Sequence, residues 1–257
     1  MRLIKKGIYY FLHTHFFISL IAVCLAYESR IILHQELSHY YIYYFIFSST
    51  FFAYNVYYTK TYESKLFITL SALGFILTCH AVYLLPSVFY LNLMIVSIAS
   101  SIYILPIFYP IKKNRIFTLQ KLLLLIFVWV VSTFVLPIKH FVPNTETFIL
   151  LIHRILLLTV SCLLFFIRDE CNGNYKQKAI SAFYIFCGLQ CASAIIVVLF
   201  VNMLLGFVYV FISIICIFLA KYFLGANRSK IKYLLYADGI LFLQSAIIII
   251  LHYFILI

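Results

Sequence analysis

The sequence predicts an all-α membrane protein, a polytopic helical bundle of about nine transmembrane helices. Its 257 residues are 66% hydrophobic and only 10% charged, whereas a soluble domain of this size must place a large share of its residues in water. Apolar runs recur from one end of the chain to the other, and each approaches the ~20 residues that a helix needs to cross a bilayer. No long hydrophilic segment separates them, so residues 1–257 are expected to form a single transmembrane helical domain.

Nine apolar runs give the predicted spans in chain order. They lie at residues 7–27, 39–58, 65–85, 87–109, 119–138, 147–167, 179–201, 203–222 and 234–256. The first run has a basic head and an apolar body, as a signal peptide has, but His13, Thr14 and His15 interrupt it and more spans follow. We therefore expect it to be retained as a helix. Residues 28–39, which follow it, mix polar and apolar side chains at nearly helical spacing and suit a short interfacial stretch.

The positions of the basic residues predict how the bundle is oriented. All but three of the 19 Lys and Arg residues lie in the N-terminal segment or near the loops that follow the even-numbered spans. The exceptions are Arg30, Lys139 and Arg154. By the positive-inside rule, the N-terminus is cytoplasmic and the C-terminus lies outside. The net charge of +12 then reflects topology and contact with anionic lipid headgroups, and no nucleic-acid partner is expected.

A polar face marks the end of the second predicted span. Asn55, Thr59 and Glu63 recur at every fourth residue, so they share one face of a helix that runs out of the membrane. Two interpretations are open at this point. The face is either a binding site or only a helix end at the interface, where Lys60 and Lys65 would extend toward the headgroups.

A second polar segment closes the sixth predicted span, on the same predicted side of the membrane. Arg168, Asp169 and Glu170 follow directly on apolar residues, and Asn-Gly-Asn at 172–174 has the composition of a solvated turn. However, carboxylates that touch hydrocarbon at a helix end are costly without a partner or a cation. That cost favours a site over a simple turn.

Ionisable residues inside the predicted spans are further candidates. Asp238 is a carboxylate about one turn inside the last span, which makes it a functional candidate. An ion pair near the cytoplasmic face is an equally good interpretation, with one of Lys221, Arg228, Lys230 or Lys232. His80 and the pair His153–Arg154 lie toward the external side, where hydrogen bonds between helices explain them better.

The two polar segments, taken with the topology, resemble the motifs of the UbiA-type intramembrane prenyltransferases. That family has nine spans and a cytoplasmic N-terminus, and it carries NxxxDxxxD after its second helix. Here the segment reads NVYYTKTYE, in which Asn55 matches the family Asn and Glu63 stands at the second Asp. Thr59 replaces the first Asp.

The rest of the resemblance covers nearly the whole chain. The family carries an RDxxxD-like motif after its sixth helix, and IRDECNGN matches it through Arg168 and Asp169, with Gly173 at the position of the later Asp. YILPIFYPIKKNR resembles a Tyr-Pro-Lys-Arg segment of the family through Tyr103, Pro106, Lys112 and Lys113. The spans that contain VWVVSTFVLP and YADGILFLQ look like those of a divergent bacterial branch.

The resemblance implies a ring of helices around a cavity that opens to lipid, in a bacterial cytoplasmic membrane. It implies transfer of an isoprenyl group from a prenyl diphosphate to an aromatic or other lipophilic acceptor. Asn55, Glu63, Asp169 and Glu170 would hold Mg²⁺, with Glu63 and Asp169 in the catalytic positions. Asn55 would also bind the diphosphate, together with a cationic clamp of Lys112, Lys113 and Arg168. The metal would neutralise diphosphate oxygens and help the leaving group depart.

Two other functions are compatible with the same residues. The chain has fewer carboxylates than a full two-metal site of this family, so it can instead be a catalytically silent relative that binds an isoprenoid or quinone lipid without turnover. A small transporter is a third possibility, but no span is broken at mid-membrane by paired Gly or Pro as transporter sites often are. The sequence gives no indication of the oligomeric state.

Overall fold

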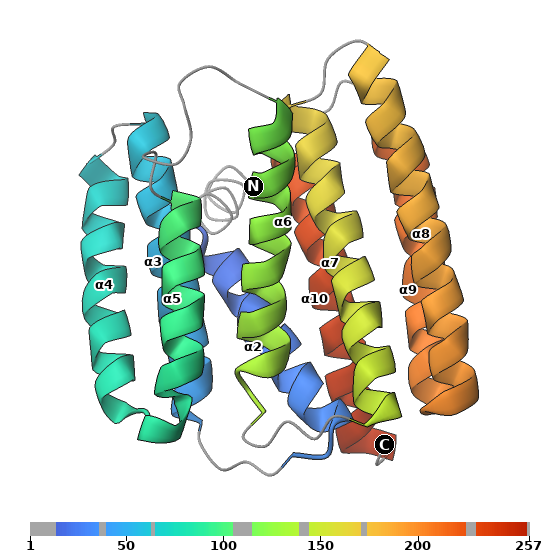
Figure 1. Ribbon diagram of the computed structural model, residues 1–257, viewed down its shortest axis with the longest axis horizontal. Coiled ribbons are helices and arrows are strands. Elements are labelled where there is room, and N and C mark those ends of the chain that lie inside the picture. The colour runs from blue at the N-terminus through green and yellow to red at the C-terminus, as the bar shows by residue number, and fades with distance from the viewer. Residues whose placement is uncertain are drawn as a thin grey trace, which may run out of the picture. The chain divides into compact units, whose positions relative to one another are not determined.

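The computed structural model confirms the all-helical prediction (Figure 1). It describes residues 14–35, 40–62, 65–104, 115–138, 144–170, 174–224 and 230–255, and within these ranges every regular element is a helix. The α-helices are α2 (Phe16–Ile32), α3 (Tyr41–Tyr62), α4 (Lys65–Leu84), α5 (Tyr90–Ile104), α6 (Arg115–Val130), α7 (Thr145–Glu170), α8 (Asn174–Phe200), α9 (Met203–Leu224) and α10 (Lys230–Ile255). A short 3₁₀ helix, η1 (Ser87–Phe89), precedes α5, and a π-helical segment, η3 (Val131–Val135), directly continues α6.

Several of these helices have the length and composition of membrane spans. Four are long and apolar enough to cross a bilayer: Lys65–Leu84, Thr145–Ile167, Lys176–Phe200 and Tyr236–Phe254. Three further apolar helices are shorter: Ser87–Tyr103, Gln120–Val135 and Met203–Leu219. Each of the nine predicted spans overlaps at least one described helix, because an apolar run long enough for a bilayer is also long enough for several helical turns.

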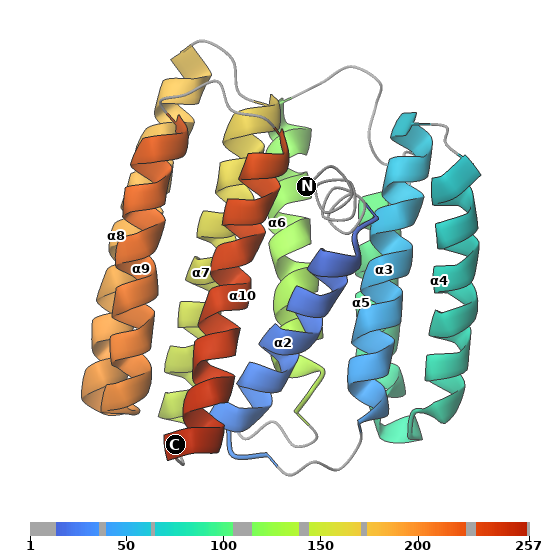
Figure 2. The same ribbon diagram turned by 180° about the vertical axis from the view of Figure 1, so that it is seen from behind.

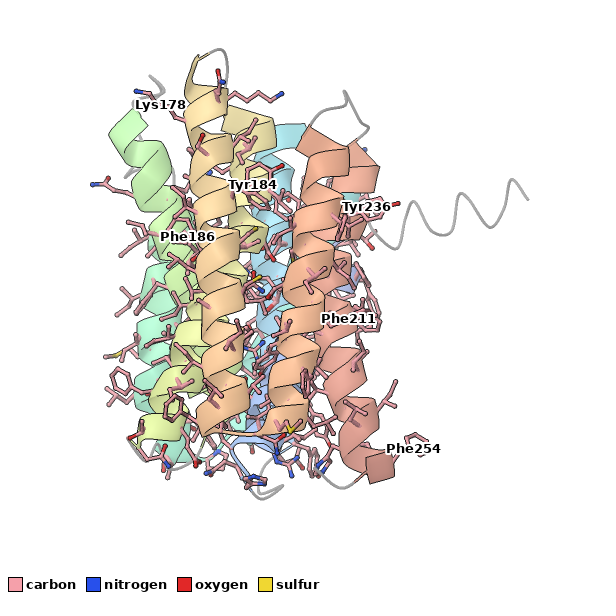
Figure 3. The ribbon with its side chains drawn as sticks, turned by 90° about the vertical axis from the view of Figure 1, so that its right-hand side faces the viewer. Lys178, Tyr184, Phe186, Phe211, Tyr236 and Phe254 are labelled. Carbon is pink, nitrogen blue, oxygen red and sulfur yellow. The ribbon has the colours of Figure 1, made fainter. Side chains whose placement is uncertain are left out.

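The exposure of side chains fits a protein surrounded by lipid. Many large apolar residues lie on the surface, and several of them are more than 60% exposed, among them Ile76, Tyr83, Phe218 and Phe254. Figure 3 shows Phe211 and Phe254 pointing away from the helices of the second half of the chain, and Lys178 near the N-terminal end of α8. Several polar residues are instead buried, among them Glu28, Asn55, Gln190 and Asp238. An apolar surface around a buried set of polar side chains is unfavourable in water and favourable in hydrocarbon.

The helices group into two compact units. The first comprises Met1–Lys113 and Val131–Lys139, and the second comprises Asn114–Val130 and His140–Ile257. In the first unit, α3 packs against α2, α4 and α5, and α2 packs against η3. In the second, α7 packs against α6, α8 and α10, and α9 packs against α8 and α10. Figure 2 shows α2 inclined to α3 within the first unit.

Glycine allows two pairs of neighbouring helices to approach closely. A Cβ atom added at Gly74 of α4 would lie 2.9 Å from the Cα atom of Phe52 on α3, too close for any side chain. One added at Gly206 of α9 would lie 2.6 Å from the Cα atom of Val198 on α8. Small residues at such contacts are typical of helices that pack inside membranes.

The end of the first helix differs from the prediction. We expected a span that ends at residue 27 and an interfacial stretch from residue 28, but α2 continues to Ile32, and Glu28 and Ser29 are fully buried within it. Ser29 donates a hydrogen bond from Oγ to the Leu25 carbonyl at 2.9 Å, so its hydroxyl is satisfied by its own helix. Polar residues at this position belong to the buried face of α2, whereas the sequence suggested a boundary.

Candidate functional site

The first polar segment lies in the last turns of α3, and Asn55 is its most buried member. The Asn55 side chain is fully buried, and its Nδ2 donates hydrogen bonds to the Phe51 carbonyl at 2.8 Å and the Thr14 carbonyl at 3.2 Å. Its Oδ1 atom is also buried and accepts no hydrogen bond from any described residue. Asn55 therefore fixes Thr14, two residues before α2, against α3 and keeps one oriented oxygen acceptor.

Thr59 follows one turn later on α3. Its hydroxyl donates to the Asn55 backbone carbonyl at 2.8 Å and lies 3.3 Å from the Ser71 hydroxyl on α4. Thr59, which stands where the resembled family has an Asp, thus joins two helices through neutral hydroxyl groups. Glu63, the third member of the predicted face, lies outside the described residues.

His15 lies at the same end of the first unit, a position that sequence reasoning did not include in the site. It is 4% exposed and has a positive φ of 61° just before α2. Its ring centroid lies 5.6 Å from that of Tyr54 and 6.1 Å from that of Phe67. The sequence did contain a signal for His15, because it is a polar residue inside an otherwise apolar run. The same kind of signal indicated Asp238 as a candidate.

The C-terminal end of α5, where the predicted Tyr-Pro-Lys-Arg-like segment begins, lies at this same end of the first unit. Tyr57 on α3 stacks on Tyr103 on α5, with ring centroids 5.9 Å apart and an interplanar angle of 23°. The two helices run in the same direction because α4 returns the chain between them, so both C-terminal ends lie together (Figure 1). Tyr103 begins the segment that leads to Lys112 and Lys113, which themselves lie outside the described residues.

The second polar segment forms the end of α7. The helix continues through Glu170, three residues beyond the predicted span, so Arg168, Asp169 and Glu170 are helical. Their side chains, and all of residues 171–173, lie outside the described set, and α8 begins at Asn174. The negative end of a helix dipole favours Arg168 and disfavours the two carboxylates there. A nearby cation would remove that penalty.

Asp238 belongs to the second unit as well and lies on α10, near the start of the apolar span Tyr236–Phe254. It is 4% exposed and lies more than two turns after Lys230, where α10 begins. Its carboxyl group lies in the neighbourhood of Cys162 on α7, and α7 packs against α10. Because Cys162 precedes Asp169 by seven residues, Asp238 lies at a level about 10 Å along α7 from the Arg168–Glu170 turn. The side chains of the four basic residues proposed to pair with it are not among the described ones.

His80 and His153 make contacts between helices, as predicted. The Tyr44 hydroxyl lies 3.3 Å from His80 Nδ1, joining α3 to α4. His153 Nδ1 lies 2.9 Å from the Ser193 hydroxyl, joining α7 to α8. Both predictions of interhelical hydrogen bonds are confirmed.

Metal binding was predicted for Asn55, Glu63, Asp169 and Glu170. Among the side chains that the structure describes, no group of three His, Cys, Asp or Glu residues is arranged to hold a metal ion. Of the predicted ligands, only the Asn55 side chain is described, and its buried Oδ1 suits a cation because Mg²⁺ prefers oxygen ligands.

No protein-family model, curated protein or solved structure matches the chain. The resemblance to the UbiA-type prenyltransferases therefore rests on the motifs in the sequence. In chemical terms, this end of the first unit carries an oriented amide oxygen, an imidazole and a pair of stacked tyrosines. The end of α7, in the second unit, carries an arginine and two carboxylates.

Proposed function

We propose that the chain is an integral-membrane prenyltransferase-like protein of the UbiA type. It would transfer an isoprenyl group from a prenyl diphosphate to an aromatic or other lipophilic acceptor, with Mg²⁺ as cofactor. The proposal includes nine spans in a bacterial cytoplasmic membrane, a cytoplasmic N-terminus and an external C-terminus.

The observation that carries this proposal is the state of the Asn55 amide. Two backbone carbonyls orient it from the donor side, which leaves the buried Oδ1 as an acceptor without a protein donor among the described residues. An unused buried acceptor destabilises a fold by about 1–3 kcal/mol. A bound cation, or a water on that cation, would offset this penalty and explain why an amide occupies the site.

Each residue would have a defined role in the reaction. Asn55 and Glu63, with Asp169 and Glu170, would hold the Mg²⁺ that neutralises diphosphate oxygens as the allylic C–O bond breaks. The residual charge of the diphosphate would be held by three cationic side chains: Lys112, Lys113 and Arg168. The apolar walls of the bundle would keep water from the allylic cation until the acceptor carbon attacks it and loses its proton.

A second candidate is a catalytically silent relative that binds an isoprenoid or quinone lipid. Thr59 favours it, because this side chain stands at a family Asp position but has no charge. Its hydroxyl is engaged with the Asn55 carbonyl and lies beside Ser71.

The test uses the purified full-length protein in lipid nanodiscs with Mg²⁺ and radiolabelled prenyl diphosphates of several lengths. A lipid extract supplies acceptors, and transfer of label into the lipid phase is measured for the wild type and for Asp169→Ala. A Ser181→Ala variant, which changes an exposed hydroxyl on α8, is the control. Product that is lost only in Asp169→Ala supports catalysis. Equal product from both, or none from either, removes the catalytic claim, and Mg²⁺-dependent retention of donor without product identifies the silent relative.

A further inference from the structure

A separate group of buried polar side chains lies in the core of the second unit, where α8 packs against α7 and α9. Five buried residues of α8 recur at alternating intervals of four and three: Phe183, Cys187, Gln190, Ala194 and Val197, and Ser193 is buried beside Ala194. This is the pattern of a helix that packs against neighbours along one seam. Gln190 occupies a core position in that pattern and is fully buried.

The Gln190 side chain makes no hydrogen bond with any residue the structure describes. Both Oε1 and Nε2 are buried, and neither has a protein partner in that part of the chain. Each buried polar group left in this state destabilises a fold by about 1–3 kcal/mol. Within a bilayer, bulk water does not reach such groups.

His153 adds a third unused group on the same seam. Its Nδ1 lies 2.9 Å from Ser193 Oγ, and the Ser193 hydroxyl donates its single proton to the Gln190 backbone carbonyl at 2.8 Å. His153 Nδ1 must therefore be the donor to Ser193. A charged imidazole would be costly in this apolar core, so the ring is neutral and Nε2 is a hydrogen-bond acceptor.

The position of the His153 ring is fixed by its neighbours. The Tyr209 ring on α9 stacks on it, with centroids 3.9 Å apart and an interplanar angle of 20°. His153 is 1% exposed, and its Nε2 is buried without a hydrogen-bonding partner among the described residues. The seam therefore contains one donor group, Gln190 Nε2, and two acceptors, Gln190 Oε1 and His153 Nε2.

We propose that this seam is a binding site for an uncharged hydroxyl group. A hydroxyl oxygen can accept from Gln190 Nε2 while its proton is donated to Gln190 Oε1 or to His153 Nε2. A cation would face the amide donor and an anion would face two acceptors, so a neutral group that both donates and accepts fits best. The hydroxyl belongs either to an ordered water or to a lipophilic alcohol or phenol that enters from the membrane.

The site is distinct from the proposed diphosphate site. Gln190 lies 16 residues after Asn174, the first residue of α8, which corresponds to about 24 Å along the helix. α8 begins just after the Arg168–Glu170 turn in the chain. The ligand of the Gln190–His153 site would therefore bind apart from the proposed transfer reaction.

The experiment compares p-cresol with toluene, which has the same shape without the hydroxyl. Thermal unfolding of the nanodisc-embedded protein is followed for the wild type and for Gln190→Leu. For a lipophilic hydroxyl we expect p-cresol to raise the Tm of the wild type by several degrees more than toluene does. The difference should vanish in Gln190→Leu. If that variant does not fold, His153→Phe replaces it and should reduce the difference.

A second measurement distinguishes water from a membrane ligand. The Gln190 side-chain amide signal of ¹⁵N-glutamine-labelled protein is examined for cross-relaxation with water. If p-cresol and toluene change the Tm equally and the amide shows a cross-peak with water, the hydroxyl belongs to ordered water. If they change the Tm equally and no such cross-peak is seen, the proposal is overturned.

Discussion

Tyr57 and Tyr103 stack with ring centroids 5.9 Å apart and join the C-terminal end of α3 to that of α5. The two residues are far apart in the sequence, and each belongs to a segment that carries a proposed diphosphate-binding function. Asn55 lies two residues before Tyr57, and Lys112 follows Tyr103 by nine. The stacked pair therefore fixes the origin of the cationic segment against the amide of the first motif.

Removing one ring of this pair should weaken both the fold and the proposed site. We expect Tyr103→Ala to reduce the free energy of unfolding by about 1–3 kcal/mol, because stacking adds to the loss of buried area. Tyr103→Phe keeps the ring and is the matched control. Unfolding in mixed micelles measures the change, and a double-mutant cycle with Tyr57→Ala isolates the pair. A coupling energy near zero would show that the stacking has no role in stability.

Thr59→Asp should strengthen Mg²⁺-dependent binding of prenyl diphosphate. The substitution places a carboxylate one turn from Asn55, where the resembled family has one, and hard cations bind more tightly as ligand charge increases. We expect roughly a tenfold gain in affinity, on the order of 1.4 kcal/mol. Thr59→Val, which removes the hydroxyl and its contacts to Asn55 and Ser71, should give no gain. Binding of labelled donor with and without Mg²⁺ is the measurement, and an equal response of both variants would contradict a metal at this face.

Gly74→Ala should destabilise the protein, whereas Gly188→Ala should not. An alanine Cβ at position 74 would meet the Phe52 backbone at 2.9 Å, but one at position 188 meets nothing within 4 Å. Overpacking of this kind typically removes about 1–3 kcal/mol. In an exposed helix interior, the change from Gly to Ala is favourable by roughly 1 kcal/mol. Unfolding midpoints of the two variants check the contrast, and similar midpoints would mean that α3 and α4 separate easily.

The sequence predicted the helices well and their ends less well. Hydrophobic runs determined the existence of each helix because the membrane requires long apolar segments with internally paired backbones. The ends of α2 and α7 were placed too early for one common reason. Glu28, Ser29 and Asp169 were interpreted as marks of a boundary, but a helix continues through polar residues wherever they lie on a buried face or in its last turn.

The contacts of the candidate sites were less predictable. Spacing alone brings Asn55 and Thr59 to neighbouring turns, but it does not identify Thr14 or Ser71 as their partners. His153 was expected to form a hydrogen bond with another helix. The sequence could not identify its partner, Ser193, because that residue lies 40 positions away. Gln190 has no local pattern that distinguishes it from a lipid-facing or interfacial glutamine. Its burial depends on which face of α8 meets α7 and α9, which only the packed structure determines.

Asn55→Asp provides the sharpest test of a cation beside the first motif. The Asn55 amide donates to the carbonyls of Phe51 and Thr14, and a carboxylate has no proton to donate, so its oxygen would face these carbonyls. Burying an unpaired charge in this way should lower the free energy of unfolding by several kcal/mol in the absence of ligand. A bound Mg²⁺ would reverse much of the loss, because the carboxylate would then gain a divalent partner. We therefore expect Mg²⁺ with inorganic pyrophosphate to raise the Tm of Asn55→Asp more than that of the wild type. Asn55→Leu, which lacks any ligand oxygen, should not respond. The same shift in all three proteins would rule out a cation at Asn55.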